Sequence, residues 1–130
     1  VEETIDFYVK MCSLSVTAAS LAGFGLVLAS DGFHPVTGKR LLASNVVRTV
    51  KTIMLTCGMY DGSGKFAVEV GVPSKSGVGG GILSVADKRM GIGIFGPALD
   101  EKGNSVAGQY VLREISEKLR LHMFEANHLV

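Results

Sequence analysis

Cysteine is scarce in this chain of 130 residues, and its two cysteines lie far apart, at Cys12 and Cys57. They form no CxxC motif. A chain of this size buries about two-thirds of its unfolded surface, and two lone thiols in such a chain are typical of core residues in a reducing compartment. With no signal peptide or transit segment visible, we expect a cytoplasmic protein.

The net charge of the chain is also small. Lys and Arg number 13 and Asp and Glu number 12, which gives a formal net charge of +1. Since no basic stripe with interleaved aromatic residues occurs, the sequence does not favour nucleic acid as a partner. Nor does it predict a membrane span, because the most apolar stretch, residues 16–29, is shorter than the roughly 18 residues required.

What the sequence does contain is a set of four segments with apolar residues at helical spacing. They cover residues 3–13, 17–29, 44–57 and 104–124. The first begins almost at Val1, which is not a methionine, and so indicates a segment cut from a longer protein. Gly32 and Gly58 follow the second and third segments, where glycine is suited to end a helix.

The central part repeats apolar residues with a period of 2, which predicts three strands. The expected strands cover residues 65–72, 82–85 and 90–94. In the last one Gly91 and Gly93 line one whole face, so a helix or another backbone is expected to lie very close there. Helices and strands in separate runs predict an α+β class, an antiparallel sheet packed with helices.

Residues 75–81 read Lys-Ser-Gly-Val-Gly-Gly-Gly and lie between the first two expected strands. Lys75 supplies a positive charge and Ser76 a hydroxyl, while the glycines leave backbone N–H groups open to a ligand. Enzymes that stabilise an oxyanion need such donors. Neighbouring residues of a strand point to opposite faces, so Lys75 and Ser76 are poorly placed for a direct nucleophile pair.

Other motifs carry less weight. The pattern Gly-x-Gly-x-x-Gly at residues 91–96 lies inside an expected strand, and Pro97 follows where a dinucleotide site needs a helix. His34, His122 and His128 have no metal-ligand spacing with one another or with the cysteines. The sequence therefore predicts neither a metal nor another cofactor.

Tyr60 follows the third helix in the run Cys-Gly-Met-Tyr-Asp. A tyrosine there is usually a packing residue. A free phenol has a pKa of about 10, so it is protonated at neutral pH and cannot act as a base. Nearby cations favour the phenolate, and Lys75 is one candidate, which makes Tyr60 a candidate proton shuttle. Tyr8, on helical spacing alone, fits a core position.

The Lys-Ser-Gly segment resembles the Lys-Thr-Gly element of penicillin-recognising serine enzymes, which combine it with a Ser-x-x-Lys nucleophile on a helix. No serine of this chain has a lysine three residues later. The nucleophile of that scheme is therefore not among these residues.

Several motifs together resemble the serine-dependent glutaminases, whose fold is that of β-lactamases and penicillin-binding proteins. The resemblance spans nearly the whole chain, with Lys39 in place of an acid of the family. It is carried by Asp-Phe-Tyr at 6–8 with Met-Cys-Ser at 11–13, by Pro-Val-Thr-Gly-Lys-Arg at 35–40, and by residues 57–61, 75–81 and 99–108.

The resemblance implies hydrolysis of L-glutamine to L-glutamate and ammonia through a glutamyl-enzyme ester. Tyr60 would be the acid/base, Val78 would give its backbone N–H to the oxyanion hole, and Lys75 would act electrostatically. The residues expected at the substrate are Tyr8, Tyr60, Ser76, Gly77 and Val78.

The family's Ser-x-x-Lys pair and its contacts to the substrate's α-amino and α-carboxylate groups lie upstream of this region. We therefore expect residues 1–130 to be the C-terminal portion of one catalytic domain, inactive without the N-terminal half of the same enzyme. The family forms dimers and tetramers, so a homo-oligomer is expected. A non-catalytic amino-acid-binding relative and another penicillin-recognising serine hydrolase remain alternatives.

Overall fold

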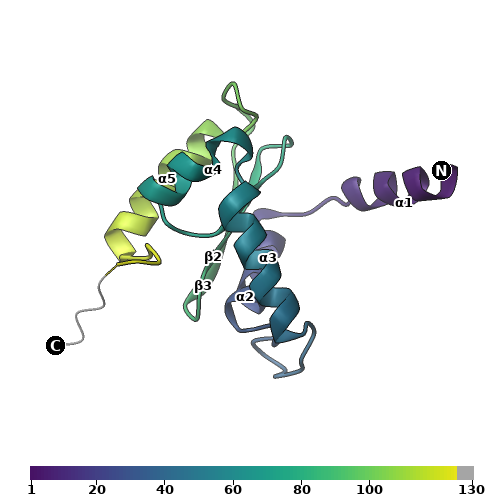
Figure 1. The fold of residues 1–130 in the computed structure, drawn as a ribbon, viewed down its shortest axis with the longest axis horizontal. Coiled ribbons are helices and arrows are strands. Elements are labelled where there is room, and N and C mark those ends of the chain that lie inside the picture. The colour runs from purple at the N-terminus through teal and green to yellow at the C-terminus, as the bar shows by residue number, and fades with distance from the viewer. Residues whose placement is uncertain (126–130) are drawn as a thin grey trace.

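A computed structural model describes residues 1–125 (Figure 1). Its helices are α1 (Glu2–Cys12), α2 (Ala18–Ala29), α3 (Ser44–Cys57), α4 (Ser63–Glu69) and α5 (Val106–Leu119), with a 3₁₀ turn at Tyr60–Gly62. Its strands are β1 (Ser74–Ser76), β2 (Gly81–Ala86) and β3 (Met90–Phe95). The predicted α+β class is confirmed. Within the described residues, none of the helices has the length and apolar character to cross a membrane.

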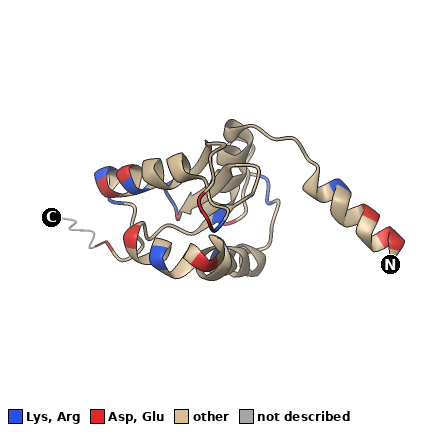
Figure 2. Cartoon of the chain, turned by 90° about the horizontal axis from the view of Figure 1, so that it is seen from above, with Lys and Arg blue, Asp and Glu red and all other residues tan. Residues whose placement is uncertain are grey.

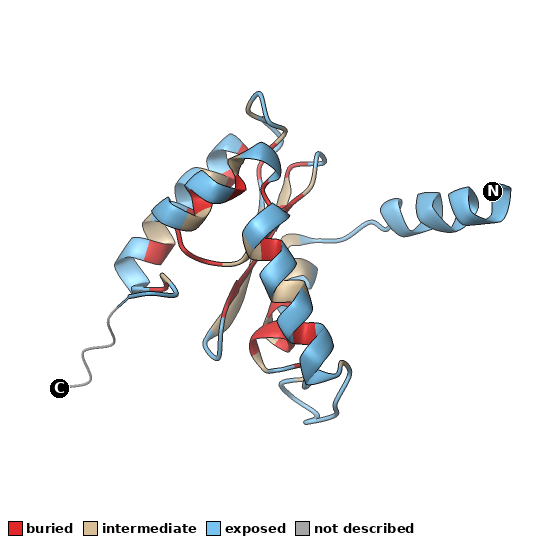
Figure 3. Cartoon of the chain, viewed as in Figure 1, coloured by how far each residue is buried: buried red, intermediate tan, exposed pale blue. Residues whose placement is uncertain are grey.

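The three strands form one antiparallel sheet in the order β1-β2-β3. The central strand is buried on both sides, because helices cover both faces of the sheet (Figure 3). Leu83 and Val85 pack with side chains of α2 and α3. Ile82 and Ala86, which point the other way, pack with side chains of α4 and with Leu112 of α5.

The close approach predicted for the glycine face of β3 is confirmed. A side chain at Gly91 would run into the backbone of Ala22 and Leu26, and one at Gly93 would meet Ala18 and Ala22. In turn, a Cβ at Gly25 of α2 would lie 2.9 Å from the Cα of Gly91. Because no side chain separates them, helix and strand pack backbone against backbone.

The strand predicted over residues 65–72 is wrong, since most of it belongs to α4. The apolar alternation there fits a helix equally well, because Ser63, Phe66 and Val70 are buried at helical spacing while Val68 is 79% exposed. The first strand of the sheet is instead the short β1, which follows Pro73. The last helix also ends earlier than predicted, at Leu119, where Arg120 takes a left-handed conformation with φ of 53°.

Helix α1 projects away from the rest of the molecule, and none of its residues is buried (Figures 1 and 3). Tyr8, for which helical spacing predicted a core position, is 67% exposed. The apolar face of α1 therefore has no packing partner within the described residues.

Surface charges of both signs are interspersed on α4 and α5 (Figure 2). The ion pairs there are Lys65–Glu69, Arg113–Glu69 and Lys118–Glu114. Such exposed pairs contribute little to stability, and they leave no strong field of one sign on these helices.

Candidate active site

The glycine-rich segment joins β1 to β2, as the sequence predicted. The N–H of Gly77 donates to the carbonyl of Gly81, and the N–H of Gly80 donates to the carbonyl of Gly77, both at 2.9 Å. Gly80 has a φ of 93°, and a Cβ there would run into the backbone at Gly96. Only glycine suits that position, so the turn has one tightly defined shape.

Val78 lies at the tip of this turn, with 71% of its surface exposed. No acceptor among the described residues is paired with its backbone N–H. An unpaired and accessible N–H is what an oxyanion hole requires.

Tyr60 has an unusual backbone conformation, with a φ of 51°. A residue other than glycine in this left-handed region carries a strain of roughly 1–3 kcal/mol, and such residues concentrate at functional sites. Ser63 holds the turn, because its Oγ accepts from the N–H of Met59 at 3.0 Å and donates to the carbonyl of Tyr60 at 2.7 Å.

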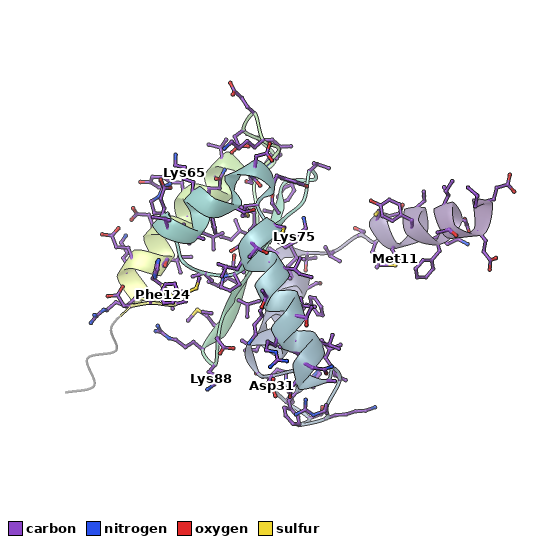
Figure 4. All side chains as sticks on the ribbon, viewed as in Figure 1. Met11, Asp31, Lys65, Lys75, Lys88 and Phe124 are labelled. Carbon is purple, nitrogen blue, oxygen red and sulfur yellow. The ribbon has the colours of Figure 1, made fainter. Side chains whose placement is uncertain are left out.

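Strand β1 is fastened beside this turn. The N–H of Ser76 donates to the carbonyl of Gly58 at 2.9 Å, and a side chain at Gly58 would overlap the backbone of Ser74. As a result the Nζ of Lys75 lies 5.0 Å from the centroid of the Tyr60 ring. Figure 4 shows Lys75 where the sheet meets the helices.

Lys75 and Ser76 of β1 point to opposite sides, as expected for neighbouring residues of a strand. Lys75 is exposed and Ser76 is buried. Partial burial lowers the pKa of Lys75 from its ordinary value. The Oγ of Ser76 is buried without a hydrogen-bond partner among the described residues.

A cavity of about 1010 Å³ is lined by Lys75, Ser76 and Gly77, whereas Tyr60 and Val78 are not among its lining residues. Its polar side is formed by Lys75, Ser76 and the glycines of the turn, and its apolar side includes Leu14, Val16, Leu21, Phe24 and Phe95. A small polar ligand therefore has charged and hydrogen-bonding groups on one side and a shielding apolar wall on the other.

A second cleft, of about 680 Å³, lies along α3. Three of its charged groups already have partners, because Lys51 pairs with Asp87 at 2.5 Å and Asp31 accepts from the Ser44 hydroxyl at 2.6 Å. The same hydrogen bond from Ser44 lowers the pKa of Asp31. The cavity at β1 is therefore the better candidate for chemistry.

The loop before α5 completes the site, and the sequence reasoning gave it no role beyond the resemblance. A Cβ at Gly103 would lie 3.7 Å from the Tyr60 ring and 3.6 Å from the side chain of Val78. The carboxylate of Asp100 closes the loop by accepting from the N–H groups of Lys102 and Asn104, each at 2.9 Å, and from the amide of Gln109 at 2.8 Å. The Asp-x-x-Gly-Asn spacing is the signal that could have revealed this turn.

The pKa of Asp100 is lowered chiefly by the backbone hydrogen bond from Asn104, with further contributions from Gln109 and Lys102. A carboxylate with a lowered folded-state pKa stabilises the fold above its unfolded value of about 3.9. That stabilisation is lost as the pH falls through the folded-state value. Asp100→Asn should therefore lower the free energy of unfolding more at pH 7 than at pH 3, as urea unfolding at both pH values would measure.

The matched control is Asp6→Asn, since Asp6 pairs with Lys10 on the exposed surface of α1. Such a pair contributes little, so its loss should change unfolding only slightly at either pH. An Asp100→Asn deficit of equal size at pH 7 and pH 3 would contradict the role of the carboxylate.

The predicted site residues are thus brought together with one exception. Lys75, Ser76 and Gly77 line one cavity at β1, Tyr60 lies beside Lys75, and Val78 follows in the turn. Tyr8 does not join them, because α1 extends away from the sheet, as the position of Met11 in Figure 4 also shows. Among the described residues, no group of three or more His, Cys, Asp or Glu side chains is placed to hold a metal ion, and His128 lies outside that part of the chain.

An antiparallel sheet with helices on both faces and a Lys-Ser-Gly edge strand is the arrangement of part of a β-lactamase-like domain. A family model described as Glutaminase matches residues 1–124. The chain belongs to the glutaminase family.

Among its relatives, Glutaminase 2 of Clostridium perfringens is 56% identical over 124 residues, which are 95% of this chain and 41% of that protein. A Bacillus subtilis glutaminase in covalent complex with 5-oxo-L-norleucine has a TM-score of 0.93 and 44% identity, over 95% of this chain and 44% of that one. A structure described as Mglu in its glutamate form has a TM-score of 0.92 and 46% identity, over 98% of this chain and 29% of that one. The chain thus spans less than half the length of these relatives.

Proposed function

We propose that these residues are the C-terminal portion of a glutaminase, an amidohydrolase that converts L-glutamine and water into L-glutamate and ammonia. The observation that carries the proposal is the convergence of three groups at the end of β1 in a chain of this family. These groups are the Tyr60 phenol, the Lys75 ammonium and the unpaired N–H of Val78.

The proposed reaction starts with a serine hydroxyl supplied from outside these residues, since no serine here belongs to a Ser-x-x-Lys motif. Its oxygen attacks the side-chain carbonyl carbon of glutamine, and Tyr60, reacting in its phenolate form, accepts the serine proton on its oxygen. The N–H of Val78 donates to the oxyanion, a contribution of about 10²–10³ in rate for one such donor.

Tyr60 then gives the proton to the nitrogen as the C–N bond breaks, and ammonia leaves a glutamyl ester on the serine. Water attacks the ester, its proton returns to the serine oxygen through Tyr60, and glutamate is released. Lys75, whose Nζ lies 5.0 Å from the centroid of the Tyr60 ring, supplies positive charge beside the reacting groups. Ser76 and Gly77 form the wall against which the amide lies, and Tyr8 contacts the bound amino acid.

The covalent complex of the Bacillus subtilis glutaminase, formed with 6-diazo-5-oxo-L-norleucine, supports a covalent route for this family member. A diazo ketone forms a bond to a nucleophile that lies next to its carbonyl group.

The surface of the chain supports the proposal that a further segment of the same enzyme completes the site. The apolar wall of the cavity includes Leu14, Phe24 and Phe95, all of them exposed. The apolar residues of α1 are exposed as well. We propose that the N-terminal half covers both, which would also give Tyr8 its place at the substrate.

We further propose that the enzyme works in the cytoplasm as a homo-oligomer. Cys12 and Cys57 are both free, as suits a reducing compartment, but both are exposed, so the prediction that they are core residues is wrong. The proposed oligomer rests on the family resemblance.

The test is ammonia release from L-glutamine, measured for residues 1–130 alone and for the joined protein, meaning residues 1–130 preceded by their upstream sequence. We expect turnover only in the joined protein. Turnover by residues 1–130 alone would show that the nucleophile lies within them and would direct attention to Ser76. An inactive joined protein would overturn the proposed function in favour of a non-catalytic or β-lactam-directed relative, which β-lactam turnover would distinguish.

A further inference from the structure

The turn that carries Tyr60 is held from a distant part of the sequence. Asn104 is 1% exposed, and its Nδ2 donates to the carbonyl of Met59 at 3.1 Å. This hydrogen bond joins residues 45 positions apart and reaches the peptide group directly before Tyr60.

Only one of the two polar side-chain atoms of Asn104 has a partner among the described residues. Its Oδ1 is buried with no hydrogen-bond partner among the described residues. A buried acceptor left unpaired is unfavourable. An apolar side chain would be enough if position 104 only had to pack the loop. The hydrogen bond to Met59 is therefore the distinctive contribution of Asn104.

Two neighbours strengthen the same connection. The Nζ of Lys102 donates to the carbonyl of Asp61 at 3.4 Å, so the loop also contacts the backbone one residue after Tyr60. Gly103, between them, lies against the Tyr60 ring and the Val78 side chain. Asp100 in turn fixes the backbone of Asn104 through its carboxylate.

We propose that Asn104 is a positioning residue, which sets the Tyr60 oxygen for proton transfer by holding the Met59 carbonyl, with Asp100 holding Asn104. The inference rests on the proposed glutaminase reaction. It assigns the loop at residues 99–105 a part in catalysis without contact to the substrate. A misplacement of about 1 Å in such a group can lower a rate about 10²-fold.

The test compares kcat and KM for L-glutamine in the joined protein carrying Asn104→Ala, Tyr60→Phe or both. We expect Asn104→Ala to lower kcat by about 10- to 100-fold with little change in KM. In the Tyr60→Phe background the same substitution should have no further effect on kcat, because residues that act as a unit are not additive. Losses that multiply in the double variant, or an unchanged kcat in Asn104→Ala, would overturn the inference.

Ser116→Ala is the matched control. Ser116, on α5, is buried like Asn104. Its Oγ donates at 2.6 Å to the backbone carbonyl of Val70, which is also far away in sequence. It should lose stability as Asn104→Ala does but keep its kcat. Equal losses of kcat in both variants would show a general structural effect. If Asn104→Ala does not fold, Asp100→Asn takes its place in the same cycle.

A readout that needs no turnover separates this inference from the proposed function. The joined protein is labelled with 3-fluorotyrosine, and the ¹⁹F resonance of Tyr60 is assigned by its absence in Tyr60→Phe. We expect that resonance to shift or broaden in Asn104→Ala and to stay in place in Ser116→Ala. An inactive wild type with this shift would overturn the glutaminase reaction but support the positioning of Tyr60, whereas an unmoved resonance would overturn the positioning itself.

Discussion

Tyr60→Phe is expected to lower kcat for L-glutamine in the joined protein by about 10²–10⁴-fold, the contribution typical of a general acid–base group. The substitution removes only the hydroxyl, which has no hydrogen-bond partner among the described residues. The strained turn is held by Ser63 and Asn104 through backbone groups. The fold and KM should therefore change little, as thermal unfolding and steady-state kinetics would show.

Tyr110→Phe is the matched control for that experiment. Tyr110 lies on α5 with 63% of its surface exposed, so loss of its hydroxyl should leave kcat unchanged. Wild-type turnover by Tyr60→Phe would rule out the acid/base role of Tyr60. Another group of the completed site would then have to carry the proton.

Gly91→Ala is expected to destabilise the fold by about 3 kcal/mol, the upper part of the range for an overpacked site. The added Cβ meets backbone atoms of Ala22 and Leu26 rather than a side chain that can turn aside. Helix α2 must therefore move off the sheet or the strand must bend. Urea unfolding of wild type and variant would measure the difference.

Gly23→Ala, a substitution on helix α2 itself, is the control and has the opposite expected result. A Cβ at Gly23 would meet nothing within 4 Å, and alanine favours a helix over glycine by about 1 kcal/mol. This control should gain stability. A Gly91→Ala variant as stable as wild type would mean that α2 does not rest on β3 as described.

The sequence predicted most of the sheet because its pattern there admits one reading. Alternate glycines in β3 can only be explained by a closely approaching backbone, and Gly25 on α2 supplies the matching surface. The prediction for residues 65–72 was wrong because their pattern admits two interpretations. Their alternation of apolar residues fits both a strand and a helix, and burial of Ser63 and Phe66, seen only after folding, decides for the helix.

The candidate site shows the same division. Lys75, Ser76 and Val78 were predictable because they are consecutive with the glycines of one turn. The left-handed conformation of Tyr60 and the hydrogen bond from Asn104 to Met59 were not. Both depend on residues far apart in sequence, and pattern rules that work over a few positions do not reach that distance.

The strand order has a consequence for handling the protein. With β2 in the middle, β3 is one edge of the sheet, and its six residues offer hydrogen-bonding groups along a side that no other strand among the described residues covers. An open edge of this length accepts any extended segment, whether from its own enzyme or from another copy. Residues 1–130 produced alone would therefore be prone to join edge to edge into aggregates, and a segment that capped β3 would protect the protein in solution.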